Sequence, residues 1–235
     1  MKEIQIRKND AGQRLDRFVG KAVPLLPESL LQKYIRLKRI KRNGKGAKRD
    51  VRLVEGDVLQ LYINDEFFER PTEENAWLKI ATPRLDIVYE DENILLADKK
   101  PGVLCHSAGE WSWDTLISNI QAYLRQSGEW DPKAENAFTP ALCNRIDRNT
   151  GGIVIAAKNA EALRILNDKI RDREIDKAYL CVVCGRPKPA EGRLEGYLFK
   201  DAVKNQVYVT KKPQPGAKSA ATEYRTLQSR KGLSL

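Results

Sequence analysis

The sequence predicts an α+β protein with a small N-terminal domain (residues 1–64), a linker (65–84) and a larger domain (85–235). Apolar residues recur at helical spacing in some segments and alternate, as in strands, in others. In the larger region strands outnumber helices and do not alternate with them, which argues against a doubly wound fold. The chain has 235 residues and is 41% hydrophobic, so each domain can bury a core.

The N-terminal domain is predicted to contain two helices and a small hairpin-rich sheet. Apolar residues at helical spacing mark "GQRLDRFVGKAV" and, after a Pro-Glu-Ser start, "PESLLQKYIRLKR". Asn43-Gly44 is a hairpin-turn signal, and the apolar residues Leu59, Leu61 and Ile63 alternate along a strand.

Acidic composition, Pro71 and Pro83 indicate the linker, and the larger domain is predicted to open with two strands in "DIVYEDENILLADKKPGVLCH". A helix carrying Leu116 to Leu124 is expected behind an Asp114 cap, and another behind an Asn159 cap. The continuous apolar run "GGIVIAAK" predicts a strand buried on both faces. The remaining predicted strands are "KAYLCVVCG", "NQVYVTKK" and "ATEYRTLQ".

The formal charge of +10 is concentrated at the N-terminus. Residues 1–64 hold 16 Lys or Arg against 7 Asp or Glu, a net +9, which leaves +1 for the rest. A solvated surface usually mixes signs, so nucleic acid is favoured over a merely basic face. The predicted phosphate-binding residues follow the second helix and surround the Asn-Gly turn: Lys33, Arg36, Lys38, Arg39, Lys41, Arg42 and Lys45.

Several classes of protein are disfavoured. No apolar run approaches a membrane span and no secretory signal is visible, so a cytoplasmic location is expected. Four cysteines are too few for a disulfide scaffold. There is no phosphate-cradling glycine motif, so no nucleotide cofactor is predicted, and the single histidine excludes a two-histidine zinc site. Nothing indicates an obligate oligomer, so a monomer is expected.

Two smaller candidates, a cysteine pair and the single histidine, have competing interpretations. Cys181 and Cys184 have the C-x-x-C spacing of metal or redox sites, but residues three apart on a strand point to opposite faces, which favours two small residues in a packed strand. His106 follows a Pro-Gly turn, which favours a hydrogen-bonded loop residue over a substrate contact.

Asp147 lies between two arginines at the start of an apolar strand, in "NRIDRNTGGIVIAAKN". If residues 145–147 are extended, Arg145 and Asp147 share a face. The spacing fits a surface ion pair as well as a pocket carboxylate kept ionised by the guanidinium, which could act as nucleophile or base. The residues alone leave these alternatives open.

The N-terminal motifs "GQRLDRFV", "SLLQKYIRLKRIKRNGK" and "VRLVEGDVLQLYI" resemble the S4-like RNA-binding domain over about residues 12–63. This resemblance implies structured RNA as the partner, a choice that composition alone does not make.

The larger region resembles the RluA-type pseudouridine synthases. "NRIDRNTGGIVIAAKN" is similar to their signature, usually written H-R-L-D-x-x-T-S-G followed by an apolar strand and A-K. "YEDENILLADKKPGVLCH", "IDKAYLCVVCG" and "KSAATEYRTL" resemble three further family motifs in the same order, so the resemblance covers roughly residues 84–235. It implies a mixed, mainly antiparallel sheet flanked by helices, and an N-terminal S4-like domain is a common partner in this family.

The resemblance implies cofactor-free isomerisation of uridine to pseudouridine in RNA. Ribosomal RNA of the large subunit is the favoured substrate. Asp147 matches the essential aspartate, Tyr179 the tyrosine that stacks on uracil, and Arg145 the arginine that fills the gap left by a flipped base. A non-catalytic RNA-binding or assembly protein is the alternative, and a structural basic protein with no specific RNA is a third.

The sequence departs from the family pattern in three places. Asn144 replaces the signature histidine and Gly151 its serine. The family continues into a strand and a T-G-R-T-H-Q-I-R-like motif, whose basic residue pairs with the aspartate, whereas this sequence stops at "RKGLSL". We expect impaired activity and an exposed sheet edge in a chain of this length.

Overall fold

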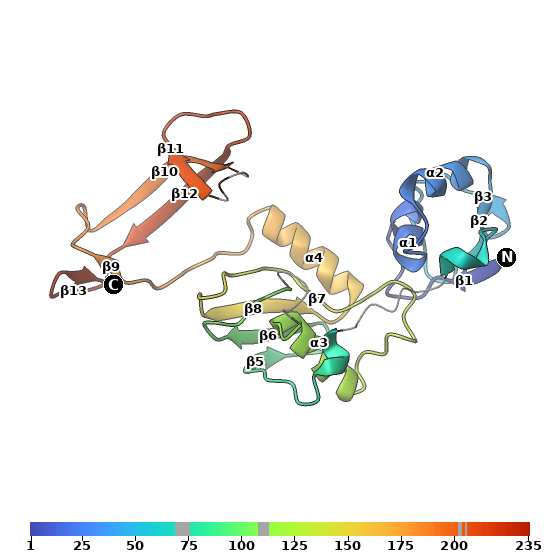
Figure 1. Ribbon diagram of the computed structural model, residues 1–235, viewed down its shortest axis with the longest axis horizontal. Helices are drawn as coiled ribbons and strands as arrows, with labels where there is room; N and C mark the ends of the chain where they lie inside the picture. Colours follow the sequence, from blue (N-terminus) through green and yellow to red (C-terminus); the bar gives the residue numbers. More distant parts are fainter. Residues whose placement is uncertain (69–75, 108–112, 202–203, 205) are drawn as a thin grey trace. The chain divides into compact units, whose positions relative to one another are not determined.

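A computed structural model describes residues 1–68, 76–107, 113–201, 204 and 206–235 (Figure 1). The chain divides into two compact units, Met1–Ile175 and Asp176–Leu235, so a boundary falls inside the region predicted as one larger domain. Residues 69–75 of the predicted linker lie outside the described residues. No helix in the described ranges is long and apolar enough to cross a membrane.

The N-terminal part of the first unit is a helix-and-sheet module. Helices α1 (Leu15–Ala22) and α2 (Glu28–Arg36) occupy the positions predicted from their apolar spacing. Asn43 and Gly44 take the positive φ angles of a tight hairpin turn, 51° and 78°, as the Asn-Gly signal predicted. The sheet has the antiparallel order β1-β4-β2-β3, formed by Lys2–Gln5 (β1), Val58–Leu61 (β4), Ile40–Arg42 (β2) and Lys45–Gly46 (β3). β1 was not predicted.

The first unit also contains a second sheet (Figure 1). Short 3-10 turns at Asp65–Phe68 and Ala76–Lys79 precede it. Its strands are antiparallel in the order β5-β6-β8-β7, formed by Ile87–Glu90 (β5), Ile94–Lys99 (β6), Gly152–Ala157 (β8) and Ala141–Leu142 (β7). Buried residues of β6 and β8 pack against α3 (Leu116–Gln126) in one apolar core.

The predicted strand at β8 exists, but its double-sided burial was wrong. Val154 and Ala156 are fully buried, whereas Ile153 is 45% exposed. The strand belongs to an antiparallel sheet with one well-covered face, and such strands alternate in burial even when all their residues are apolar.

One predicted helix cap is confirmed and the other is shifted by a residue. Asn159 accepts a hydrogen bond from the Ala162 N–H and caps α4 (Ala160–Arg171). Thr115 caps α3 through the Ser118 N–H, and Asp114 instead accepts a bond from the Asn119 side chain at 2.7 Å. Threonine is a weaker cap than aspartate but still a favoured one, so position along the chain rather than residue preference decided between them.

The second unit contains two small antiparallel sheets, ordered β11-β10-β12 and β13-β14-β9. Strands predicted at "NQVYVTKK" and "ATEYRTLQ" are confirmed for the described residues, although the long strand β10 was not predicted. The strands are Val183–Cys184 (β9), Glu191–Asp201 (β10), Gln206–Thr210 (β11), Lys218–Arg225 (β12), Ser229–Arg230 (β13) and Leu233–Ser234 (β14).

The strand predicted for "KAYLCVVCG" is mostly wrong. Only Val183 and Cys184 pair, with β14, and residues 177–182 have no regular secondary structure. Cys181 and Cys184 are both exposed rather than packed. The apolar pattern predicts a strand, but a strand forms only where another strand offers its backbone groups, and here that partner spans two residues.

All strand pairs within the named strands are antiparallel, and four α-helices accompany them in the described part of the chain. The predicted α+β class with mainly antiparallel sheets is therefore confirmed.

Candidate active site

Asp147 lies in the loop between β7 and β8. Its carbonyl accepts a hydrogen bond from the Thr150 N–H at 3.1 Å, which closes a turn immediately before the strand. Arg145 and Asp147 are exposed, while Ile146 between them packs against the central core. The alternation expected for an extended segment is thus present, and it turns the arginine and the aspartate away from the core.

The ion-pair interpretation of Asp147 is wrong within the described residues, where its carboxylate pairs with no cation. Arg145 instead brings its positive charge close to His106, whose pKa is lowered by desolvation and by this guanidinium. An exposed carboxylate without a counter-ion is free to act as nucleophile or base.

The loop that follows β6 is bonded to the Asp147 loop at several points. Gly102 N–H donates to the Arg148 carbonyl at 2.8 Å, and Arg148 Nε donates back to the Gly102 carbonyl at 3.1 Å. Lys99 Nζ also donates to the Arg148 carbonyl, at 3.0 Å. The "KKPG" segment and the signature segment are therefore one connected structure around Asp147.

Asn144, which stands where the related signature has histidine, completes the edge of β8. Its Oδ1 accepts from the Ile155 N–H at 2.8 Å, and its Nδ2 lies 3.4 Å from the Ile153 carbonyl. The side chain thus bonds β8 on both sides of Val154, just where the short strand β7 ends. We infer a structural role for this asparagine.

Gly151, which replaces the signature serine, lies tightly against the preceding loop. A Cβ at this position would be 3.2 Å from Pro101 Cδ and 3.5 Å from the Lys99 carbonyl. The first distance is shorter than ordinary van der Waals contact, so a side chain here would require Pro101 to shift. Glycine at position 151 therefore permits the close approach of Pro101 in the Lys-Lys-Pro-Gly segment.

Tyr179 lies in the second unit. Its side chain is 62% exposed, and it belongs to the irregular segment 177–182. Within the first unit the structure places Arg145 and Asp147 on one loop; the role and placement of Tyr179 at that site stay a prediction.

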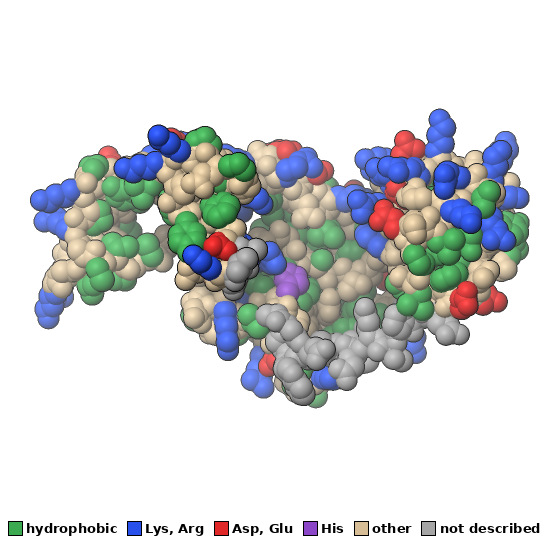
Figure 2. Space-filling view, turned by 45° about the horizontal axis from the view of Figure 1, so that its top comes forward, with side chains coloured by type: hydrophobic (Ala, Val, Ile, Leu, Met, Phe, Trp, Pro, Cys, Tyr) green, Lys and Arg blue, Asp and Glu red, His purple; other side chains and the backbone are tan. Residues whose placement is uncertain are grey.

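The predicted phosphate-binding residues lie on the N-terminal module, where Lys and Arg side chains are numerous (Figure 2). Five of the seven are exposed, and two rest on aromatic rings: Arg39 lies 5.0 Å from the centroid of Tyr34, and Lys41 lies 5.2 Å from that of Tyr62.

Arg42 is the exception in this set. Its Nε bonds Asp57 at 2.6 Å, and Asp57 is only 6% exposed. The Asn43 side chain and the Val54 N–H donate to the same carboxylate. Burial raises the pKa of Asp57, but the bonds from Arg42, Val54 and Asn43 lower it overall. The guanidinium is committed to this buried carboxylate, so Arg42 is the weakest candidate for a phosphate contact.

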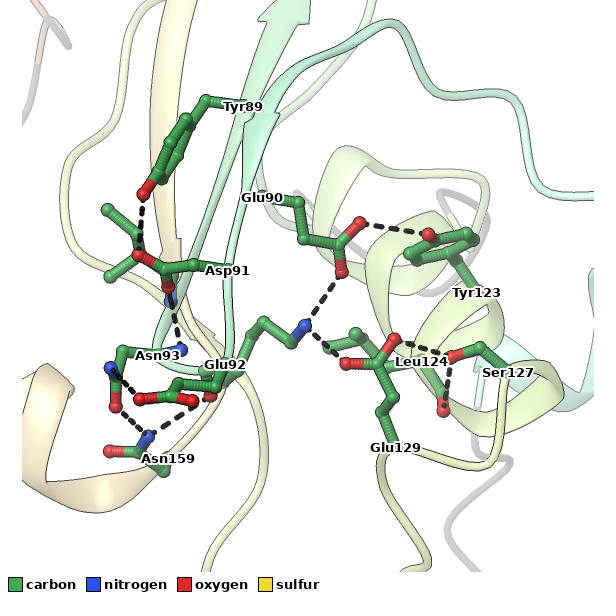
Figure 3. A network of polar contacts seen from close by, with 12 residues as sticks. Tyr89, Glu90, Asp91, Glu92, Asn93, Tyr123, Leu124, Ser127, Glu129 and Asn159 are labelled. Atoms are coloured by element: carbon green, nitrogen blue, oxygen red, sulfur yellow. Dashed lines mark hydrogen bonds and ion pairs between the residues drawn. The ribbon is translucent and has the colours of Figure 1, made fainter.

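Sequence reasoning missed two lysines whose side chains are largely buried. Lys99 is 1% exposed and its Nζ donates only to backbone carbonyls. The Lys158 side chain is 7% exposed and pairs with Glu90 at 2.8 Å and with Glu129, two glutamates that Figure 3 labels. Buried lysines are rare without such partners, but a lysine in the sequence looks like any surface residue. The one available signal was their position at the ends of predicted apolar strands.

Among the described residues, no group of three or more His, Cys, Asp or Glu side chains could hold a metal ion.

Comparison with known proteins agrees with the signature motifs. Residues 93–235 match the family described as RNA pseudouridylate synthase. An uncharacterized RNA pseudouridine synthase of Mycoplasma genitalium is 32% identical over 92% of this chain and 66% of its own length. The ribosomal large subunit pseudouridine synthase C of Rickettsia bellii is 30% identical over 92% of this chain and 70% of its own. Synthase D of Borreliella burgdorferi is 29% identical over 71% and 51%.

This chain thus spans between about half and about 70% of the length of these relatives. The family match extends over more than half of the chain and includes both Asp147 and the loops bonded to it. The chain belongs to the RNA pseudouridylate synthase family.

Proposed function

We propose that this chain isomerises uridine to pseudouridine within RNA, with Asp147 as the reacting group. Family membership supports the reaction class. The observation that carries the residue assignment is the geometry of the 143–151 loop. Asp147 is exposed and unpaired among the described residues, while the peptide units around it are hydrogen-bonded to a neighbouring loop. A fixed backbone with a free carboxylate suits covalent or base catalysis.

The reaction is an isomerisation, so its atoms balance within the nucleotide and no co-substrate is consumed. The bond from N1 of uracil to C1′ of ribose breaks, the base rotates, and C5 bonds to C1′. The proton leaves C5 and N1 gains one. Asp147 attacks the ribose or the base to permit bond cleavage, and Tyr179 stacks on the uracil and is the candidate for proton removal.

Arg145 has a separate role in the proposal. A uridine inside a stem must leave the helix before its glycosidic bond is accessible, which costs a few kcal/mol of stacking. Arg145 is exposed beside Asp147, and a guanidinium can stack in the space left by the base.

Release of tritium from RNA labelled at C5 of uridine tests the assignment, since the C5 proton is lost in the reaction. We expect release by the wild-type chain and a loss of at least roughly 1,000-fold in Asp147→Asn, as for removal of a nucleophile. Asp172→Asn is the matched control, because this carboxylate pairs with Arg171 on the surface of the same unit. Equal release by Asp147→Asn and wild type would refute the assignment.

We further propose that the N-terminal module is an S4-like domain that binds the RNA backbone. The support is the charge excess of residues 1–64 and the exposed cations on α2 and the following turn. Replacing Lys33, Arg36 and Arg39 with alanine should weaken RNA binding and reduce the slope of log K against log salt by roughly two to three.

Lys169, Arg171 and Arg173, at the end of α4, provide a control triple with the same loss of charge. Binding that falls equally in both triples would indicate a general charge effect, and would contradict a specific surface on the N-terminal module.

Large-subunit ribosomal RNA is the proposed substrate class, on the strength of the names of two relatives, the C and D synthases. Labelled large-subunit RNA, small-subunit RNA and transfer RNA should be compared at equal uridine concentration, with release expected from the first. Tight binding without release from any RNA would instead favour a non-catalytic RNA-binding or assembly protein.

A further inference from the structure

The two peptide carbonyls that flank Asp147 are both held from the same neighbouring segment, residues 99–105, which we call the clamp loop. Cys105 Sγ donates to the carbonyl of Ile146 at 3.4 Å, on one side of the aspartate. Lys99 Nζ and the Gly102 N–H donate to the carbonyl of Arg148, on the other side, at 3.0 and 2.8 Å. Asp147 is thus bracketed at the backbone while its carboxylate stays free.

Lys99 is an unusual residue to bury for stability alone. It is 1% exposed and forms no ion pair with any carboxylate that the structure describes. Its three hydrogen bonds go to the carbonyls of Lys100 at 3.2 Å, Val103 at 2.9 Å and Arg148 at 3.0 Å. A buried ammonium is costly unless its donors are satisfied. Two of these carbonyls shape the clamp loop and the third belongs to the catalytic loop, so the ammonium ties the two loops together.

Cys105 supplies the second point of attachment. Its side chain is 6% exposed and belongs to the central apolar core. Of the atoms around it, the Ile146 carbonyl accepts its thiol hydrogen, and Ile146 itself packs against the same core. The thiol therefore fixes the Ile146–Asp147 peptide to the apolar core beneath it.

We propose that Lys99 and Cys105 are positioning residues that hold the Asp147 peptide in the orientation in which its carboxylate reaches the flipped nucleotide. The proposal rests on the proposed function of Asp147. Neither side chain touches the RNA; each acts through the backbone on one side of the aspartate. A displacement of a reacting group by about 1 Å can cost 100-fold in rate, so the clamp loop governs the chemical step more than RNA affinity.

The first test is single-turnover tritium release, with the RNA dissociation constant measured in parallel. Lys99→Met keeps the length of the side chain and removes its donors, and we expect a rate constant lower by about 10- to 100-fold at unchanged RNA affinity. Cys105→Ala should lose about fivefold, and Cys105→Ser, which retains a donor, should recover most of the wild-type rate.

Lys100→Met is the matched control for Lys99. The neighbouring Lys100 is 61% exposed and pairs with Asp86 and Asp98, both at 2.7 Å, rather than with the Asp147 loop. We expect its single-turnover rate to match wild type. Wild-type rates in Lys99→Met and Cys105→Ala, with Asp147→Asn inactive, would overturn the positioning role while sparing the proposed function. Equal losses in Cys105→Ala and Cys105→Ser would likewise overturn the role of the thiol as a donor.

A second measurement does not depend on activity. Backbone NMR order parameters of residues 146–150 should fall in Lys99→Met and Cys105→Ala and stay at wild-type values in Lys100→Met. Unchanged order in the first two variants would overturn the proposal even if no chain is active. If order falls in these two variants but the wild-type chain releases no tritium, the proposed function is contradicted and the positioning role is not. If Lys99→Met fails to fold, the single-turnover rates of Cys105→Ala and Cys105→Ser still test the positioning role.

Discussion

Two lysines with largely buried side chains lie at opposite ends of β8: Lys99, the last residue of β6, and Lys158, just after β8. They have different kinds of partner. Lys99 is the register partner of Gly152, at the start of the strand, and donates to three backbone carbonyls. Lys158 follows Ala157 at the other end and is paired with the carboxylates of Glu90 and Glu129, which Figure 3 labels.

The difference in partners implies a difference in role. Carboxylates neutralise a buried ammonium, and the Lys158 pairs join β5, the end of β8 and the segment after α3, so they stabilise the sheet. The Tyr123 hydroxyl donates to Glu90 at 2.9 Å and extends this network into α3. Carbonyls do not neutralise the charge of Lys99, but they fix the paths of two loops beside Asp147. One end of the strand is built for stability and the other for positioning.

The largest loss of stability is expected from Lys158→Met. Removing one partner of a buried ion pair leaves carboxylates without a counter-charge and usually costs about 3–5 kcal/mol. Glu129 is 40% exposed, and solvent screens its share, so we expect a loss of about 2–3 kcal/mol in the free energy of unfolding. Urea denaturation measures it, and the chemical step per folded molecule should be unchanged.

Lys169→Met is the control for this prediction. Lys169 pairs with Glu174 at 2.7 Å, but both side chains are about half exposed. Its unfolding midpoint should match that of wild type. If both variants shift the midpoint equally, the Lys158 network has no special contribution, and the contrast between the two ends of β8 fails.

A smaller loss is expected from Gly151→Val at the other end of the strand. The new Cβ would be 3.2 Å from Pro101 Cδ, and the extra methyl groups would force the clamp loop away. Overpacking of this kind costs about 1–3 kcal/mol. Unlike Lys158→Met, this variant should also slow single-turnover tritium release, because the clamp loop holds the Asp147 peptide. If Gly151→Val is less stable but fully active, the proposed positioning role of this end of β8 is contradicted.

The Lys158 contribution should depend on pH at both extremes. The Lys158 ammonium lowers the pKa of Glu129 below 4.5, so this stability is present above that value and lost as pH falls through the folded pKa. Burial lowers the pKa of Lys158, but the two carboxylates raise it above 10.5 overall, so stability is present below that value and lost as pH rises through the folded pKa. The difference in unfolding free energy between wild type and Lys158→Met should be flat from about pH 5 to pH 10. If this difference changes between about pH 5 and pH 10, the stability cannot be assigned to the ion pairs of Lys158.

Local patterns predicted much of the fold because local chemistry determines it. The helices α1 and α2 follow from apolar spacing, the Asn43-Gly44 turn from its tolerance of positive φ, and the α4 cap from Asn159. The motif order predicted the family and placed Asp147 in the loop just before β8.

Contacts between distant segments were not predictable in the same way. Lys99 is recognisable as a buried donor only once Arg148, 49 residues away, supplies a carbonyl. Arg42 looked like its basic neighbours until the fold placed Asp57 beside it. The predicted strand containing Tyr179 shrank to two residues because its pairing depends on a β-partner that apolar composition does not reveal.

The smallest effect on stability is expected at Tyr179, the proposed active-site residue that has no clamp of its own. Its side chain is 62% exposed in an irregular segment, so Tyr179→Ala should change the free energy of unfolding by no more than roughly 0.5 kcal/mol. If the ring stacks on the uracil, its loss should slow tritium release by about 10- to 100-fold, as expected for 1–3 kcal/mol of base stacking.

Tyr179→Phe keeps the ring and removes the hydroxyl, so it separates stacking from proton removal. A rate near that of wild type indicates stacking alone, and a rate as low as that of Tyr179→Ala indicates that the hydroxyl takes part. Leu180→Ala is the control, because this neighbour is 78% exposed in the same segment. Equal activity in Tyr179→Ala and wild type would remove the tyrosine from the site and leave Asp147, with its two backbone anchors, as the residue on which the chemistry depends.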